Sequence, residues 1–503
     1  MIIARFLSIS FFIIVTFSAV AQFDLNFSKK DKIEVSTKYE NSSLGSSREE
    51  YYFVYPDGMN LYIRTCSVGG MKPSSHTVTA YLFDASGKLK STVEKSLASD
   101  ELDASRIVGV YQMNGHAIVV TKTNGRQMDD FALWEIGDDL KFQKRAELKS
   151  VKWDCVQDVQ SHITASDNGQ YLGIITGSGG KVFLFDKELQ KIYDKVLIKT
   201  ANNPDLDGSR LDNFAISNSG NISISLLVEE KQKNLLAFAA LDKGSWLLLS
   251  VDPRKDEVKP WNLAATLGVG YYSSNSSKFL ELPNGETAFL YGENNTEDPK
   301  FNSLVHFLRI DHGLGEISQD RTVEVEGQLD PAMKAVNAYV RLYDASVTGK
   351  GNIIVPMLIS NYDGPSTTNS FYQALVLDNT GAVVASKQLS LSRIQNSELG
   401  NMHAFLVGDK YYLYYQADKD EATMANAGQM NGHKLPLVKV KELQYCVAEL
   451  DAGGKACKWS EVPFNSSITA KDKKVWKDKN SDVVVYKYSS GDALEMEVFG
   501  GKK

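Results

Sequence analysis

The sequence predicts an all-β fold built from one four-stranded unit that recurs along the chain. Residues 161–198 show the unit most clearly: the strand candidates are SHITAS, YLGIIT, KVFLF and KIYDKVLI, and the turns between them are DNGQ, GSGG and KELQ. Asn168-Gly169 supplies the positive φ angles that a tight hairpin turn requires. The second and third runs are apolar on both faces, as expected for a sheet that is covered on both sides.

The same pattern of strands and turns occurs in six further segments, which gives seven complete units. The units span residues 49–97, 106–148, 161–198, 213–252, 278–325, 338–391 and 403–462. In the fourth unit we expect LLAFAAL and SWLLLSVD to be the third and fourth strands. This choice makes the following segment, PRKDEVKPWNLAATLGVGYYSSNSS, a connection into the fifth unit.

An eighth unit is divided between the two ends of the chain. Residues 473–499 supply three strand candidates, and KIEVSTKY, residues 32–39, supplies one more. The repeat period of about 55–60 residues suits propeller blades, whereas an array of β-sandwiches needs about seven strands per ~100 residues. We therefore predict a single β-propeller with eight four-stranded blades, its ring closed by N- and C-terminal strands in one blade. Seven blades are the alternative, if the terminal segments pack as an irregular extension.

The repeat pattern resembles that of the β-propeller superfamily, in the manner of WD-repeat and related bacterial extracellular propellers. The resemblance covers nearly the whole mature chain as a pattern of strands and turns. The Gly-His and Trp-Asp pairs of WD repeats do not recur from unit to unit in this sequence. The resemblance therefore implies the fold and assigns no functional residue.

Residues 1–21 have the layout of a secretory signal peptide. Arg5 precedes an apolar run from Phe6 to about Phe17, and Ala19-Val20-Ala21 forms a small-x-small cleavage pattern. The apolar run is shorter than the ~20 residues of a membrane span. We expect a mature domain over residues 22–503, located in the periplasm or outside the cell. No later segment approaches ~18 uninterrupted apolar residues, so we expect no membrane insertion after cleavage.

Charge and motifs exclude several function classes. The formal net charge is −7, and charges of both signs are interspersed, which argues against a nucleic-acid partner. The sequence contains no zinc-binding His or Cys pair, no nucleophile elbow and no phosphate-binding glycine loop. The sequence therefore names no catalytic residue.

The segment NNPDLDGSRLDN contains the one motif that suggests a metal ion. Asn203, Asp205 and Asp207, followed by Gly208, match the first half of a calcium loop. Phe214 stands where the closing acidic ligand is expected, so a solvated loop is the alternative. Calcium is the only cofactor that the sequence suggests.

Cys446 and Cys457 flank the predicted turn in YCVAELDAGGKAC, so they lie on adjacent strands of one hairpin. In an exported protein such a pair can form a disulfide, and free thiols are the alternative. We expect Cys66 and Cys155 to be buried free thiols.

The longest loops of the predicted propeller gather on one face, in the fifth to seventh blades. These loops and the connection into the fifth blade carry Trp261, Tyr271, Tyr272, Tyr362 and Asp363. Aromatic side chains of this kind anchor protein partners or stack on sugars. Packing of the loops themselves is the alternative role for each residue.

Two main functions fit these observations, and a surface structural or adhesive protein is a third option. The first is a monomeric, non-enzymatic binding or scaffold module that uses the long loops of the fifth to seventh blades to bind a protein or a glycan. The second is a carbohydrate-active or other hydrolytic enzyme with carboxylates near the central channel, where two partly buried acids, one of raised pKa, are required.

Overall fold

The computed structural model describes the strands and most of the short hairpin turns of the chain. The described residues are 25–29, 33–34, 47–55, 57, 59–68, 75–84, 88–96, 106–124, 128–152, 162–176, 181–197, 210–229, 243–266, 277–294, 303–325, 338–343, 345–362, 368–388, 403–407, 410–418, 443–451, 461–463, 473–477, 483–488 and 493–501. The expected signal peptide, the expected calcium ligands Asn203, Asp205 and Asp207, and Cys457 lie outside these residues.

The described strands form eight antiparallel sheets, six of four strands and two of five. We number the sheets by the unit to which they belong. The strands of sheets 1 to 4 are β3 (Ser47–Val54), β4 (Asn60–Val68), β5 (Ser75–Phe83) and β6 (Leu89–Ser96); β7 (Arg106–Met113), β8 (His116–Asn124), β9 (Met128–Ile136) and β10 (Phe142–Lys152); β11 (His162–Ala165), β12 (Tyr171–Thr176), β13 (Lys181–Asp186) and β14 (Lys191–Val196); β15 (Arg210–Ile216), β16 (Ile222–Glu229), β17 (Lys243–Asp252) and β18 (Glu257–Thr266).

Sheets 5 to 8 complete the chain. Their strands are β19 (Ser277–Glu281), β20 (Thr287–Asn294), β21 (Ser303–Asp311) and β22 (Glu316–Val325); β23 (Ala338–Leu342), β24 (Ser346–Val347), β25 (Ile353–Tyr362), β26 (Thr368–Leu377) and β27 (Val383–Gln388); β28 (His403–Val407), β29 (Lys410–Asp418), β30 (Leu443–Asp451) and β31 (Glu461–Pro463); β32 (Lys473–Lys477), β33 (Val483–Tyr488) and β34 (Ala493–Gly501), with β1 (Leu25–Lys29) and β2 (Ile33–Glu34). The predicted all-β fold of repeated four-stranded antiparallel sheets is confirmed.

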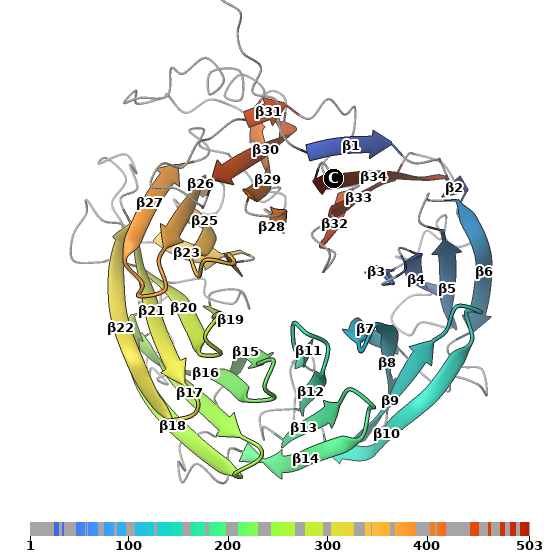
Figure 1. Ribbon diagram of the computed structural model, residues 1–503, viewed down its shortest axis with the longest axis horizontal. Helices are drawn as coiled ribbons and strands as arrows, with labels where there is room; N and C mark the ends of the chain where they lie inside the picture. The colour runs from blue at the N-terminus through green and yellow to red at the C-terminus, as the bar shows by residue number, and fades with distance from the viewer. Residues whose placement is uncertain are drawn as a thin grey trace, which may run out of the picture.

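The sheets are arranged around a common axis, and the first strand of each unit lies nearest to this axis (Figure 1). In sheets 1 to 6, successive sheets pack face to face, because side chains alternate between the two faces of each strand. In β8, Val119 packs into the core shared with sheet 1, whereas its neighbours Ile118 and Val120 pack into the core shared with sheet 3. The same sharing of a core joins sheets 3 and 4, 4 and 5, and 5 and 6. This packing explains why the middle strands are apolar on both faces.

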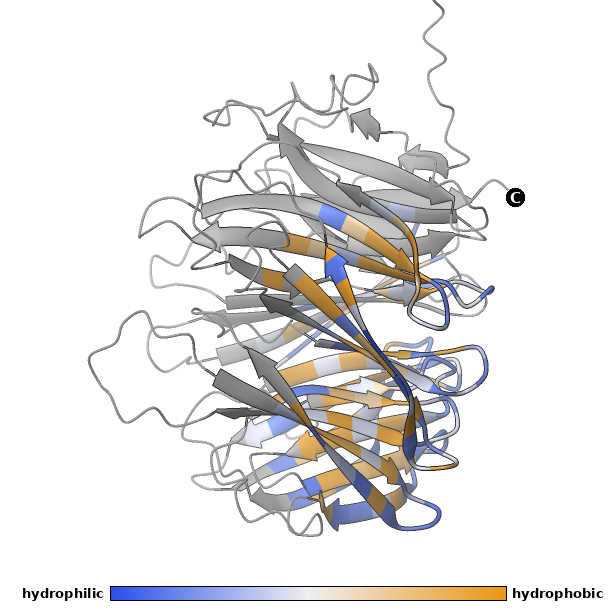
Figure 2. Ribbon diagram, turned by 90° about the vertical axis from the view of Figure 1, so that its left-hand side faces the viewer, coloured by the Kyte–Doolittle hydropathy of each residue, from blue (hydrophilic) through white to orange (hydrophobic). Residues whose placement is uncertain are grey.

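The described hairpin turns lie together along one side of the molecule and are hydrophilic (Figure 2). Asn168-Gly169 is in the turn between β11 and β12, where Gly169 has a φ of 64° and donates its N–H to the carbonyl of Ser166. A side chain at this position would be strained, so the prediction of a glycine turn here is confirmed.

An aspartate at the end of the third strand stabilises the turn between the third and fourth strands of several sheets. Asp186 Oδ1 accepts the N–H groups of Glu188 and Gln190 at 3.0 and 2.9 Å. Asp378 Oδ1 does the same for Thr380 and Ala382 at 2.8 and 2.9 Å. The aspartate that closes the third apolar run in these repeats is therefore a turn residue, whose side chain accepts the free N–H groups of the turn.

The structure corrects two details of the expected strands. In sheet 4, the segment containing SWLLLSVD is the third strand, β17, and the fourth is β18, which lies within the segment expected to be a connection. At the N-terminus, Leu25–Lys29 pairs with β34 over five residues, and Ile33 and Glu34 are the described residues of KIEVSTKY that pair with the same strand.

Candidate functional site

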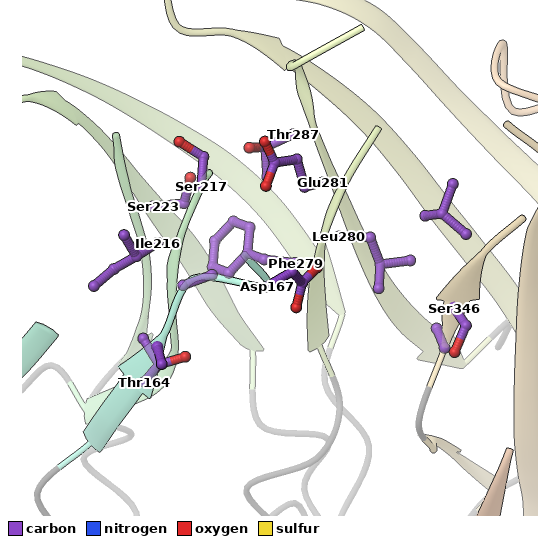
Figure 3. Close-up of a pocket in the computed structure, with 14 residues that line it drawn as sticks. Thr164, Asp167, Ile216, Ser217, Ser223, Phe279, Leu280, Glu281, Thr287 and Ser346 are labelled. Atoms are coloured by element: carbon purple, nitrogen blue, oxygen red, sulfur yellow. The ribbon is translucent and has the colours of Figure 1, made fainter. Parts of the chain in front are cut away.

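A cavity of about 490 Å³ lies near the axis, at the end where the first hairpin turns gather. We call it the axial pocket (Figure 3). Its wall comes from the innermost strands of four successive sheets, 3 to 6, with contributions from the second strands of sheets 4 and 5. The lining residues are Thr164, Ala165, Asp167, Ala215, Ile216, Ser217, Ser223, Phe279, Leu280, Glu281, Thr287, Ala345, Ser346 and Val347.

The lining combines acids, hydroxyls and apolar surface. Asp167 and Glu281 are its two carboxylates, and none of the described lining residues is Lys, Arg or His. Hydroxyl side chains line it from four sheets: Thr164, Ser217, Ser223, Thr287 and Ser346. Phe279 adds an aromatic surface and packs on Phe289 with ring centroids 4.7 Å apart. Such a surface suits a polar ligand without negative charge, because two carboxylates repel an anion.

Glu281 ends the innermost strand of sheet 5 and is half-buried. Its Oε2 accepts the backbone N–H of Asn218, in the first hairpin turn of sheet 4, at 2.7 Å. Burial raises the pKa of the Glu281 carboxyl above its usual value; the hydrogen bond from Asn218 opposes this effect, and the charge of Asp167 adds to it. The two acids therefore interact electrostatically across the pocket, and Glu281 holds its proton more firmly than an exposed glutamate.

The first hairpin turns of sheets 2 to 5 are hydrogen-bonded to each other. Asn114 N–H donates to Gly169 O at 2.9 Å. The backbone N–H of Asn168 donates to Asn218 Oδ1 at 2.7 Å, and its side-chain amide donates to Asn218 O at 3.2 Å. The bond from Asn218 to Glu281 continues this series of contacts, which we call the turn belt. The belt fixes the positions of the turns that carry Asp167 and Ser217.

A buried histidine supports the wall of the pocket between sheets 4 and 5. His312 Nδ1 lies 2.6 Å from Ser250 Oγ, and its Nε2 lies 2.8 Å from Thr287 Oγ1. Burial lowers the pKa of His312 to about 4, against the smaller opposing effects of Asp311 and Asp252. The imidazole is therefore neutral at physiological pH and bridges two hydroxyl groups, one of which lines the pocket.

A second buried polar cluster joins the same two sheets. Asp212, on the innermost strand of sheet 4, contacts Ser225 Oγ at 3.4 Å and forms a shorter hydrogen bond with the Ser277 hydroxyl. Asp212 is 3% exposed and is absent from the lining of the pocket. Within the described part of the chain, no three His, Cys, Asp or Glu residues are placed to hold a metal ion.

Trp261 was expected in a connecting loop, and the structure places it in β18 instead. It pairs with Leu248 of β17 and packs, partly buried, against the core between sheets 4 and 5. The expected loop position of Trp261 was wrong. LLAFAAL was expected to be the third strand of this sheet and SWLLLSVD the fourth, which made the segment with Trp261 a connection. Its role in binding stays a prediction.

The other predicted site residues are only partly described. Tyr362 is the last residue of β25 and pairs with Thr368 of β26. Cys446 lies on β30, where it pairs with Tyr415 and Pro463. Tyr271, Tyr272, Asp363, Asn203, Asp205, Asp207 and Cys457 lie outside the described residues. The binding surface on the long loops, the calcium site and the disulfide therefore stay predictions.

Sequence reasoning missed the acids of the axial pocket, although the repeat contains a signal for one of them. When the units are aligned on the positive-φ glycines Gly169, Gly220, Gly285 and Gly351, the residues four positions earlier correspond to one another. These residues are Ala165, Ile216, Glu281 and Val347, and all four line the pocket. A carboxylate at a position that is otherwise apolar marks Glu281.

Comparisons with known proteins give no family for this chain. No family model and no curated protein matches it. Similar solved structures include the polysaccharide lyase Uly1, with a TM-score of 0.40 and 11% identity over 95% of this chain and 99% of that chain. They also include the β-propeller domain of the Trilobed protease from Pyrococcus furiosus, with a TM-score of 0.35 and 9% identity over 83% of this chain and 98% of that one.

A prolyl endopeptidase is also similar, with a TM-score of 0.36 and 11% identity over 88% of this chain. This chain spans only 55% of the length of that peptidase. The similar structures thus include β-propeller domains. Structural similarity at TM-scores and identities this low carries no information on activity or substrate. In the described residues there is no helix long and apolar enough to cross a membrane.

Proposed function

We propose that the protein is an exported eight-bladed β-propeller whose ring closes in sheet 8. The order β1-β34-β33-β32 supports this proposal, because it combines one N-terminal strand with three C-terminal strands. The cores shared by successive sheets support a blade-to-blade arrangement. Deleting residues 22–34 tests the closure: in a closed ring it exposes the edge of β34 and lowers the unfolding temperature. An unchanged unfolding temperature favours seven blades with an irregular extension.

We further propose that the protein binds a saccharide in the axial pocket. The observation that carries this proposal is the lining of that pocket: two carboxylates, five hydroxyl side chains, one aromatic ring and no cationic side chain among its described residues. Carboxylates and hydroxyls accept hydrogen bonds from sugar hydroxyls, while an aromatic ring packs on the apolar face of a sugar. The surrounding sheets hold these groups in place, so that little reorganisation is required on binding.

Calorimetric titration of residues 22–503 with a panel of neutral and aminated oligosaccharides tests the proposal. We expect binding that Glu281→Gln and Ser346→Ala each weaken by roughly threefold to tenfold, because each change removes one hydrogen-bonding group. Glu324→Gln is the matched control, since Glu324 is an exposed carboxylate on the outer strand of the same sheet as Glu281. Absence of binding to the whole panel, or equal binding by the three variants, would contradict the proposal.

The carboxylate pair favours hydrolysis of a glycosidic bond as a second candidate. A carboxyl of raised pKa, such as that of Glu281, can protonate the leaving oxygen, while the second acidic side chain, that of Asp167, activates water or attacks the sugar. Reducing ends released from the same oligosaccharides would support this candidate, provided that Glu281→Gln abolishes the release. Binding without such release leaves the non-enzymatic binding module as the function.

A further inference from the structure

The interface between sheets 4 and 5 is rich in polar side chains, whereas the other described interfaces of sheets 1 to 6 are packed mainly by apolar ones. On β16, the side chains packed against sheet 3 are Ile222, Ile224 and Leu226, and the residues that alternate with them are Ser223 and Ser225. Buried polar side chains from both sheets lie at this interface, and we call them the polar seam. They are Asp212, Ser223, Ser225, Ser250, Ser277, Thr287 and His312.

Hydrogen bonds across the polar seam join the two sheets. Near the axis, the Ser277 hydroxyl of sheet 5 bonds to Asp212 of sheet 4, and Asn213 Nδ2 donates to the carbonyl of Ser277 at 3.0 Å. Farther out, His312 of sheet 5 lies 2.6 Å from Ser250 Oγ of sheet 4. Among the described residues, the apolar cluster between these sheets is smaller than the clusters at the other interfaces of sheets 1 to 6. Less apolar burial therefore opposes separation of these two sheets.

The axial pocket and the polar seam are continuous. Ser223 of sheet 4 and Thr287 of sheet 5 belong to the seam and also line the pocket. Ser223 pairs directly with Ser250 across β16 and β17, and Thr287 is hydrogen-bonded to His312. The walls of the pocket on these two sheets therefore keep their separation only while the seam is closed.

His312 is the basic member of the seam, and acid changes its charge. A neutral imidazole donates one hydrogen bond and accepts another, which suits the hydroxyl groups of Ser250 and Thr287. Protonation places a positive charge on a side chain that is 7% exposed, and a buried charge is costly. Exposure of the imidazole to water removes this cost, so protonation favours an open seam.

The charged groups that face His312 do not remove the cost of burial. Asp311, in its own turn, and Asp252, at the end of β17, both favour the protonated form, yet burial outweighs them and holds the pKa of His312 at about 4. Asp252 is also paired with the cationic side chains of Arg254 and Lys255. From β20 the facing group is an uncharged hydroxyl.

We propose that the polar seam is an acid-sensitive gate of the axial pocket, in which protonation of His312 separates sheets 4 and 5 and opens the pocket. Separation at the seam breaks a few polar contacts and one small apolar cluster, whereas complete unfolding breaks every sheet. Glu281 opposes the gate, because its raised pKa favours the closed form in acid. The gate goes beyond the proposed saccharide binding and does not depend on it.

Thiol labelling of buried cysteine reporters tests the proposal. Ser225→Cys places a thiol within the seam at a fully buried position. Thr121→Cys is the matched control, since Thr121 is also buried and accepts a hydrogen bond from Trp134 in the core between sheets 1 and 2. Each variant is labelled with 4,4′-dithiodipyridine at pH 7 and pH 4.5, and the labelled peptides are quantified by mass spectrometry. Every rate is divided by that of the unfolded protein at the same pH.

We expect labelling of Ser225→Cys to be at least about tenfold faster at pH 4.5 than at pH 7, because His312 titrates near 6.5 when exposed and near 4 when buried. Labelling of Thr121→Cys should not accelerate. The additional change His312→Gln should abolish the acceleration at Ser225→Cys, since a glutamine side chain can bond to both hydroxyls and gains no charge in acid.

Three results would overturn the gate. Equal acceleration of both reporters would show global unfolding in acid, and unchanged labelling of Ser225→Cys would show that the seam stays closed. Acceleration that persists with His312→Gln would show that another group is responsible. Ser277→Cys, on the sheet 5 side of the seam, replaces Ser225→Cys if circular dichroism at pH 7 shows that the first reporter alters the fold. Saccharide binding is tested separately by the titration described above.

Discussion

Glu281 accepts a hydrogen bond from the backbone N–H of Asn218, and the carboxylate that lines the axial pocket thereby also joins sheet 5 to the turn of sheet 4. The ionised carboxylate makes the stronger hydrogen bond, yet burial favours its protonated form. The site and the stability of the fold are therefore linked through one ionisable group.

The Glu281→Gln variant should reveal this link through the pH dependence of stability. A raised pKa means that the folded state binds the proton more tightly than the unfolded state. The unaltered protein therefore loses free energy of unfolding as the pH rises through the titration range of Glu281. The Glu281→Gln variant has no carboxyl group at this position, so its free energy of unfolding does not fall for this reason. Urea unfolding between pH 3 and pH 7 should show the original protein losing stability relative to the variant as the pH increases. A constant difference across this range would contradict the assignment, and Glu324→Gln serves as the control.

His312 should make the fold sensitive to acid in the opposite direction. Burial lowers its pKa to about 4 from 6.5, so the folded state binds fewer protons than the unfolded state within this window. Stability is therefore lost as the pH falls from about 6.5 to about 4, by an amount on the order of 3 kcal/mol. His312→Gln should lose much less stability over the same window in urea unfolding. Parallel pH profiles of the two proteins would refute this role of His312.

A side chain at Gly173 should destabilise the fold, because sheets 3 and 4 approach closely there. A Cβ at Gly173 would lie 2.2 Å from Ile216 Cδ1 and 2.7 Å from Phe214 Cζ. Gly173→Ala should cost about 1–3 kcal/mol of unfolding free energy through overpacking. Gly349→Ala is the control, since a Cβ at Gly349 has nothing within 4 Å. Equal stabilities of the two variants in thermal unfolding would contradict the close approach.

Two buried tyrosines offer a matched test of a contact between sheets. Tyr55 Oη donates to Ile136 O at 3.0 Å and joins sheet 1 to sheet 2, whereas the buried Tyr193 hydroxyl has no hydrogen-bond partner in the described structure. Tyr55→Phe should cost about 1 kcal/mol, and Tyr193→Phe should be neutral or slightly stabilising. Urea unfolding measures both. The reverse order of stabilities would show that the Tyr55 contact contributes nothing.

The sequence correctly predicted the features whose conformation depends on neighbouring residues alone. Asn168-Gly169 formed the expected turn because its conformation depends on neighbouring residues alone. Trp261 was misplaced because LLAFAAL was expected to be the third strand of sheet 4, which made the segment with Trp261 a connection; Pro260 beside it is compatible with an outer strand that has no neighbour on one side. Asp167 and Glu281 could not be paired from sequence, since only the packing of sheets 3 to 5 around the axis brings their units to one cavity.

The pairing of Leu25 with Gly501 has a consequence for how the protein is made. The two residues are far apart in the sequence, so sheet 8 cannot be completed until β34 has been synthesised. Pairing of segments so distant in sequence forms slowly. For the exported protein that we propose, this delay is useful, because a chain must remain open while it is threaded through a membrane. Strand β34 would then complete sheet 8 only after it and β1 have both reached the same side of the membrane.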